Sequence, residues 1–125
     1  MLRFHIALGV PILFLASFAS AEELVLVPGQ EFCAMDRQTR NEQTTTMYLN
    51  YDAVTFEAIE YYCEFGAFDP GNWRRSKVET LIGYCSEPGV FTPEMRVFVI
   101  SDGLSGVIEV YHENGEKVEY VTCER

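Results

Sequence analysis

A small antiparallel β-barrel, or a sandwich-like meander, stapled by two disulfides is the fold class that the sequence predicts. Three observations predict it. The last third of the chain alternates apolar runs with turn residues, the segments before it are rich in β-branched and aromatic residues, and four cysteines follow an export signal. Short strands separated by turn signals are typical of antiparallel barrels and sandwiches.

Residues 1–21 have the features of a secretory signal peptide. Arg3 is followed by an apolar run, and the segment ends in the small-x-small pattern ASA. The apolar run is too short to span a bilayer and no second one follows, so we expect no transmembrane segment in the mature chain. Residues 22–125 are expected to form a single domain. The ending of the signal favours the periplasm, with secretion as the alternative.

The charge balance limits the classes of molecule that the protein is expected to bind. The chain has 9 basic and 19 acidic residues and a formal net charge of −10. Such a charge disfavours nucleic acids and anionic membranes and favours either a basic partner or none. We therefore expect a protein partner and no nucleic acid.

The cysteines Cys33, Cys63, Cys85 and Cys123 predict a covalent framework. An even number of cysteines in a small exported domain is typical of disulfides. A zinc or redox site usually contains a close cysteine pair, and here the nearest two are 22 positions apart, so we expect no metal. Sequence alone permits three pairings. We favour Cys63 with Cys85 and Cys33 with Cys123, the second of which ties the ends of the mature chain together.

The first half of the mature chain contains two strand signals. LVLV at 24–27 predicts a short strand that ends at a Pro-Gly pair. The run at 36–43 is polar and is expected to be a loop. TTTMYLNY at 44–51 predicts the next strand, because it is rich in threonine and tyrosine.

The segments 54–63 and 78–85 fit two interpretations. Apolar positions in both recur at helical spacing. Strand-forming residues nevertheless fill most of 54–63, and Gly83 would weaken a helix by about 1 kcal/mol relative to Ala. We predict strands, with a bulge reconciling the apolar spacing. The alternative fold is α+β, with two short helices that end near Cys63 and Cys85 and pack on a C-terminal three-stranded meander.

The C-terminal region 95–125 predicts strand, turn, strand, turn, strand, with a DG pair at the first turn. Asn114-Gly115 at the second turn predicts a two-residue type I′ hairpin, in which both residues have positive φ. That turn places Tyr111 opposite Val118.

Few residues support catalysis. His112 is the one histidine of the mature chain and lies beside the predicted hairpin turn, where side chains are usually exposed. No nucleophile elbow, glycine-rich phosphate loop or EF-hand loop is present, so we expect neither an enzyme nor a cofactor. A hydrolase that uses a pair of carboxylates is the remaining catalytic alternative.

The stretch GNWRRSK is the one basic segment, and it contains Trp73, Arg74, Arg75 and Lys77. Trp and Arg are the residue types most enriched at binding hot spots. The competing interpretation is that Trp73 folds back and caps the barrel. We predict an exported, non-catalytic binding domain, an inhibitor or accessory subunit acting on a protein partner in the cell envelope. The alternative is a β-barrel carrier of a small ligand or glycan.

Overall fold

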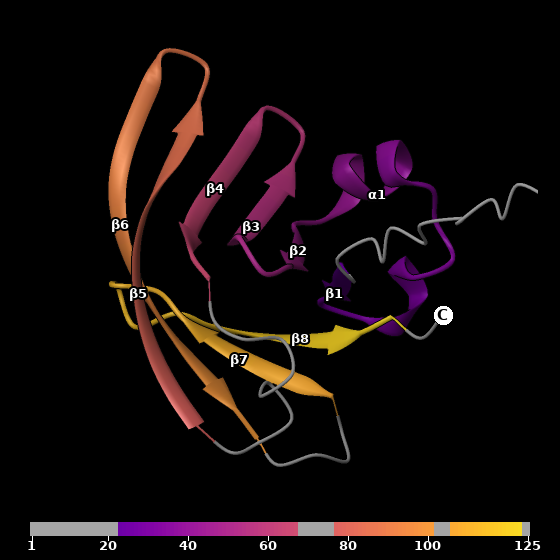
Figure 1. Ribbon diagram of the computed structural model, residues 1–125. Coiled ribbons are helices and arrows are strands. Elements are labelled where there is room, and N and C mark those ends of the chain that lie inside the picture. The colour runs from indigo at the N-terminus through magenta and orange to yellow at the C-terminus, as the bar shows by residue number, and fades with distance from the viewer. Residues whose placement is uncertain (1–22, 68–76, 102–105, 124–125) are drawn as a thin grey trace, which may run out of the picture.

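Eight antiparallel strands close into a barrel (Figure 1) in this computed structural model, which describes residues 23–67, 77–101 and 106–123. Each strand pairs with the next along the chain, and the last returns to the first. The strands are β1 (Leu24–Val27), β2 (Thr46–Leu49), β3 (Ala53–Ala58), β4 (Tyr61–Gly66), β5 (Lys77–Glu87), β6 (Val90–Ile100), β7 (Val107–Tyr111) and β8 (Lys117–Thr122). The predicted all-β barrel is confirmed, and the α+β alternative is wrong.

The segment 54–63 forms strands, as predicted, but a tight turn replaces the expected bulge. Ala58 pairs with Tyr61 across a two-residue turn, in which Glu60 has a φ of 51°. Phe56 and Cys63 are direct partners across this hairpin, and both are fully buried. Their helix-like spacing therefore arises because they face the same interior from two adjacent strands.

The polar run 36–43, predicted to be a loop, contains the helix α1 (Arg37–Gln43). Asp36 is its N-cap, since the backbone N–H of Thr39 donates to Asp36 Oδ1 at 2.9 Å. Arg40 is buried and donates to the hydroxyl of Tyr48 at 3.0 Å. The helix contacts the barrel through this buried polar interaction and not through an apolar stripe. Its sequence therefore lacks the hydrophobic periodicity that would have predicted a helix.

The β7–β8 hairpin exists where predicted, but its register differs by one residue. Tyr111 lies opposite Lys117 and not Val118. The N–H of Gly115 donates to the carbonyl of His112 at 2.9 Å, and Gly115 has a φ of 85°. The connection is therefore a three-residue loop with glycine in the left-handed region, the next most common solution after the two-residue turn.

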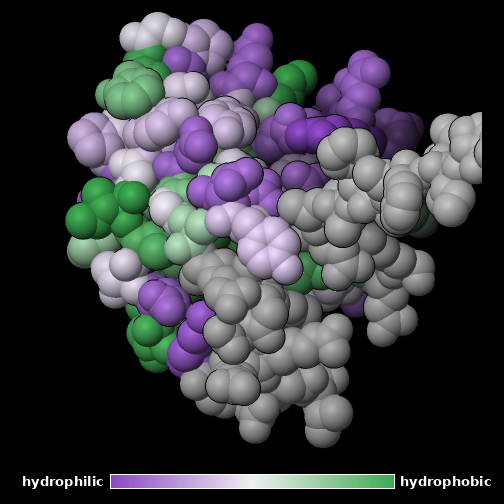
Figure 2. Space-filling view, viewed as in Figure 1, coloured by the Kyte–Doolittle hydropathy of each residue, from purple (hydrophilic) through white to green (hydrophobic). Residues whose placement is uncertain are grey.

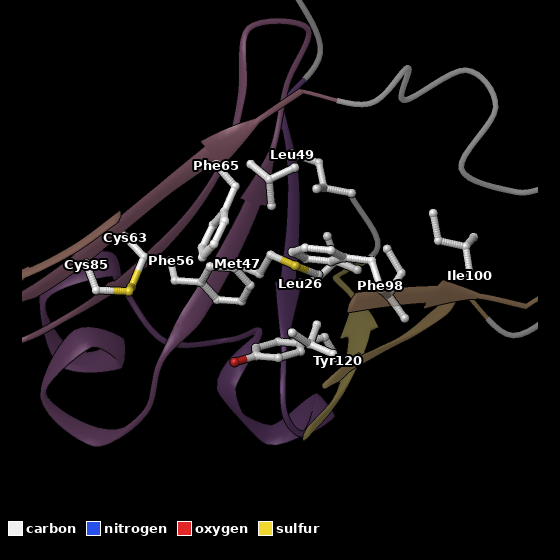
Figure 3. Packing of buried hydrophobic residues seen from close by; sticks show 13 residues of the cluster. Leu26, Met47, Leu49, Phe56, Cys63, Phe65, Cys85, Phe98, Ile100 and Tyr120 are labelled. Carbon is white, nitrogen blue, oxygen red and sulfur yellow. A yellow bond between two sulfur atoms is a disulfide. The ribbon is translucent and has the colours of Figure 1, made fainter. Parts of the chain in front are cut away.

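Aromatic side chains fill the barrel interior (Figure 3). Phe56 lies at the centre, with ring centroids 5.8 Å from Phe65, 6.1 Å from Phe98 and 5.7 Å from Tyr120. Apolar side chains from β1, β2, β3, β6 and β7 and the Cys63–Cys85 pair complete the cluster. A short 3-10 turn, η1 (Gln30–Phe32), follows β1.

Both favoured disulfides are present. Cys63 and Cys85 are register partners on β4 and β5, with Cα atoms 4.0 Å apart. Cys33, directly after η1, bonds to Cys123, directly after β8, with Cα atoms 5.4 Å apart. No free cysteine remains among the described residues.

Candidate binding surface

The longest hairpin of the barrel carries an exposed apolar surface. β5 and β6 are paired along their whole length, from Lys77 with Ile100 to Glu87 with Val90. Because side chains alternate along a strand, the even positions of β5 and the odd positions of β6 point outward. We call the outward cluster the hairpin face and define it by Val78, Ile82, Tyr84, Phe91 and Met95.

The side chains of this face are exposed and contact one another. Ile82 is 75% exposed and lies opposite Met95, while Phe91 is 68% exposed and stacks on Tyr84 with ring centroids 4.6 Å apart. Figure 2 shows hydrophobic residues gathered on the side where Figure 1 draws β5 and β6. Five of the eight exposed large apolar side chains of the described residues belong to this one hairpin. Such gathering is typical of interaction sites.

A tyrosine–glutamate pair borders the hairpin face on either side. Tyr84 donates its hydroxyl to Glu64 of β4 at 2.8 Å, and Tyr111 of β7 donates to Glu109 at 2.9 Å. These hydrogen bonds to carboxylates raise the pKa of both tyrosines, because loss of the proton would break the hydrogen bond and place a second negative charge beside the carboxylate. The two carboxylates are thereby held in fixed positions and keep acceptor capacity toward solvent.

A groove of about 420 Å³ lies at one end of the hairpin, between the β3–β4 turn and the β5–β6 turn. Arg37 engages one of its carboxylates, Glu57, with Nη2–Oε2 and Nε–Oε2 distances of 2.6 and 3.0 Å. Glu60 and Glu87 have no ion pair within the described residues. The groove is lined by Glu57, Ala58, Glu60, Tyr61, Tyr62, Ser86, Glu87 and Pro88.

Arg96 fixes the wall of this groove from inside the barrel. Its side chain is 2% exposed, and its Nη2 donates to the hydroxyl of Tyr61 at 2.7 Å and to Glu94 at 2.9 Å. The guanidinium carbon lies 4.5 Å from the ring centroid of Phe56 and 5.1 Å from that of Phe65. Tyr61 is therefore anchored before any ligand arrives.

A second cavity of about 500 Å³ lies between α1 and the end of β3. Glu57, which forms the ion pair with Arg37 described above, lines both this cavity and the first groove. The second cavity is lined by Arg37, Gln38, Asn41, Glu42, Glu57 and Ile59.

Of the site residues predicted from the sequence, Lys77 is described. It is the first residue of β5 and lies 3.5 Å from Glu79 in an ion pair. Trp73, Arg74 and Arg75 lie outside the described residues, so the basic loop stays a prediction.

Sequence reasoning missed the hairpin face, although a signal was present. Leu81 and Ile82 on β5 are adjacent apolar residues, and β6 ends in four of them, VFVI. Adjacent residues of a strand point to opposite faces. A single-layer barrel buries only one face, so such runs place apolar side chains on the outside as well.

Within the described ranges, no three His, Cys, Asp or Glu side chains lie together in a way that could hold a metal ion. No helix of the same ranges is long and apolar enough to cross a membrane. Comparison of the chain with protein-family models, with curated proteins and with solved structures finds no match.

Proposed function

We propose that the protein is an exported, non-catalytic binding domain that docks on a protein partner through the hairpin face. The observation that carries the proposal is the exposure of Ile82, Phe91 and their apolar neighbours on one hairpin. An apolar centre bordered by polar groups is the usual composition of a protein–protein interface, and tyrosine is enriched there. The hairpin face has this composition, with Tyr84 in it and carboxylates beside it.

The architecture favours surface docking over the carrier alternative. A carrier of a small ligand holds it in an apolar cavity of several hundred Å³. Here the rings of Phe56, Phe65, Phe98 and Tyr120 pack against each other along the barrel interior (Figure 3). The two cavities described above are instead lined by residues of the β3–β4 and β5–β6 turns and of α1 and the end of β3.

The hairpin is also suited to the role of an inhibitor or accessory subunit. β4 pairs with β5 only along Gly83–Ser86, and β7 pairs with β6 only along Val97–Ile100. Each end of the hairpin therefore extends past a neighbouring strand, while the Cys63–Cys85 disulfide holds its middle to β4. A rigid, extended segment loses little entropy when it binds.

The envelope location belongs to the same proposal. Two disulfides fit an oxidising compartment, and the predicted signal peptide at 1–21 provides export. The periplasm is our first choice, with secretion as the alternative.

Site-specific photo-crosslinking in the native host tests the docking face. A benzoylphenylalanine replaces Ile82 in one variant and Tyr51, which is 60% exposed near the β2–β3 turn, in a control variant. We expect one specific adduct with another protein at position 82 and none at position 51. A third probe at Trp73 tests the loop predicted from the sequence. Absence of an adduct at position 82, or equal adducts at 82 and 51, overturns the proposed function.

A further inference from the structure

The charge distribution points to a basic protein as the partner. We infer that a lysine or arginine of this partner enters the groove at the end of the hairpin face, between Glu60 and Glu87. The inference rests on the proposed function, because it takes the hairpin face as the docking surface.

The cations of the described residues are already engaged within the domain. Four of them form ion pairs with carboxylates, and the fifth is buried against a tyrosine hydroxyl. The chain as a whole carries a net charge of −10, so its surface field is negative and attracts positive partners. The five are Arg37 with Glu57, Lys77 with Glu79, Arg96 with Glu94, Lys117 with Glu119, and Arg40 with Tyr48.

The groove is continuous with the hairpin face. Tyr62, which lines the groove, pairs in register with Ser86, and Ser86 pairs with Phe91. Phe91 in turn stacks on Tyr84 within the face. A partner that lays an apolar surface on the face therefore brings its neighbouring side chains to the mouth of the groove.

The groove offers a cation two kinds of attraction. Glu60 comes from the β3–β4 turn and Glu87 from the end of β5, so two separate hairpins supply the carboxylates. Tyr61 and Tyr62 also line the groove, and tyrosine rings attract cations through their quadrupole. Because Arg96 already holds Tyr61, part of the ordering cost is met before binding.

A second copy of this chain is a poorer occupant of the same surface. In a two-fold dimer the face would meet itself, and each border carboxylate, Glu64 and Glu109, would approach the like-charged border of the other copy. Like charges brought together across an interface oppose association. A basic protein instead places its cations against these carboxylates.

The test uses the partner identified through the adduct at position 82, purified and titrated against the full mature domain. The variant Glu60→Gln/Glu87→Gln removes two charges from the groove without removing side-chain volume. The control Glu31→Gln/Asp52→Asn removes the same charge at exposed sites elsewhere. We expect a partner with net positive charge, an affinity loss of about tenfold or more for the groove variant, and a change within about twofold for the control.

The salt dependence gives a second readout. Attraction between exposed charges weakens with ionic strength, so raising the salt from 50 to 500 mM should weaken the wild type more than the groove variant. Three results overturn the inference: a partner with net negative charge, a second copy of the chain in the adduct, or equal affinities of the two charge variants. None of them contradicts the hairpin face as the docking surface. Absence of any adduct at position 82 contradicts both this inference and the proposed function.

Discussion

Arg96 links the covalent, aromatic and polar parts of the barrel at a single position. Its Nη2 lies 3.6 and 3.5 Å from the two sulfurs of the Cys63–Cys85 disulfide, and Phe56 lies against its guanidinium. Glu94 supplies the counter-charge at 2.9 Å. A buried cation of this kind is tolerated only because each contact offsets part of its desolvation cost.

We expect Arg96→Ala to destabilise the domain by about 3 kcal/mol or more. The change leaves Glu94 without its partner, removes the donor to Tyr61 and opens a cavity beside Phe56. Urea denaturation monitored by circular dichroism measures the loss. The variant Arg96→Met/Glu94→Gln, which keeps volume and removes both charges, should recover much of it. Equal denaturation midpoints for Arg96→Ala and the wild type contradict this role.

Tyr120 makes the stability of the domain sensitive to alkaline pH. Burial raises the pKa of this tyrosine from 10.0 to about 12. The folded state therefore binds the proton more tightly than the unfolded state. The resulting stability is fully present below pH 10 and is lost as the pH rises toward 12. We expect the melting temperature of Tyr120→Phe to match the wild type at pH 8 and to exceed it at pH 11.5. A constant difference between the two proteins over this range contradicts the assignment.

Among the elements, β4 and β5 leave no room for a side chain at Gly83. A Cβ at this position would meet the backbone carbonyl of Glu64 and lie 2.7 Å from Cδ1 of Phe65. A Cβ placed in the same way on Gly66, at the end of β4, has no other atom within 4 Å. We expect Gly83→Ala to cost about 1–3 kcal/mol, through forced shifts in a packed region, and Gly66→Ala to be nearly neutral. Thermal unfolding of the two variants measures this difference. Similar melting temperatures would contradict the close packing of β4 against β5 at Gly83.

The strands were the most predictable elements, and their register the least. LVLV ends at a Pro-Gly pair, and turn residues separate the strands of the C-terminal meander, so their positions follow from local chemistry. The β7–β8 register depends on which of two loop types the turn adopts, and Asn114-Gly115 is compatible with both. A difference of one residue in the loop then shifts every pair in the hairpin.

The helix and the hairpin face escaped prediction for a shared reason. Both depend on contacts between different elements of the fold or on which strand face meets the interior. Arg40 of α1 is buried only because Tyr48 of β2 accepts its hydrogen bond. Ile82 is exposed only because its neighbours Leu81 and Gly83 face inward. The disulfide pairing, by contrast, is the one favoured among the three that the sequence permits, and it fits a barrel in which β4 neighbours β5 and β8 returns to β1.

On the scale of the whole molecule, closure of the barrel depends on a short seam. β1 and β8 share two register pairs, Leu26 with Thr122 and Val27 with Val121. The N–H of Cys123 donates to the carbonyl of Val25 at 2.8 Å, directly beside these pairs. The Cys33–Cys123 disulfide therefore ties the two ends of the barrel together where the strand pairing is weakest.

We expect Cys33→Ala/Cys123→Ala to cost about 4–5 kcal/mol, since this bond spans 90 residues of sequence. The amides of β1 and β8 should then exchange with deuterium earlier than those of β4 and β5, because the seam opens first. Cys63→Ala/Cys85→Ala serves as the comparison and should not favour exchange at the seam. Uniform acceleration in the first variant contradicts a seam held by this disulfide.

The molecule as a whole presents a rigid, negatively charged barrel with one apolar side. Its described cations are paired or buried, its interior is packed, and its exposed large side chains gather on β5 and β6. The binding proposal joins these features, and it depends most on the claim that the hairpin face is the contact surface.

The measurement that tests this claim most directly is the affinity of Ile82→Ser/Phe91→Ser for the partner crosslinked at position 82. The control, Tyr51→Ser, removes a side chain that is similarly exposed, at 60%, but lies outside both the hairpin and the groove. We expect the hairpin variant to lose at least about a hundredfold in affinity, as for central interface anchors, while its melting temperature stays close to that of the control. Unchanged affinity of the hairpin variant, or an equal loss in the control, contradicts the assignment of the hairpin face as the contact surface.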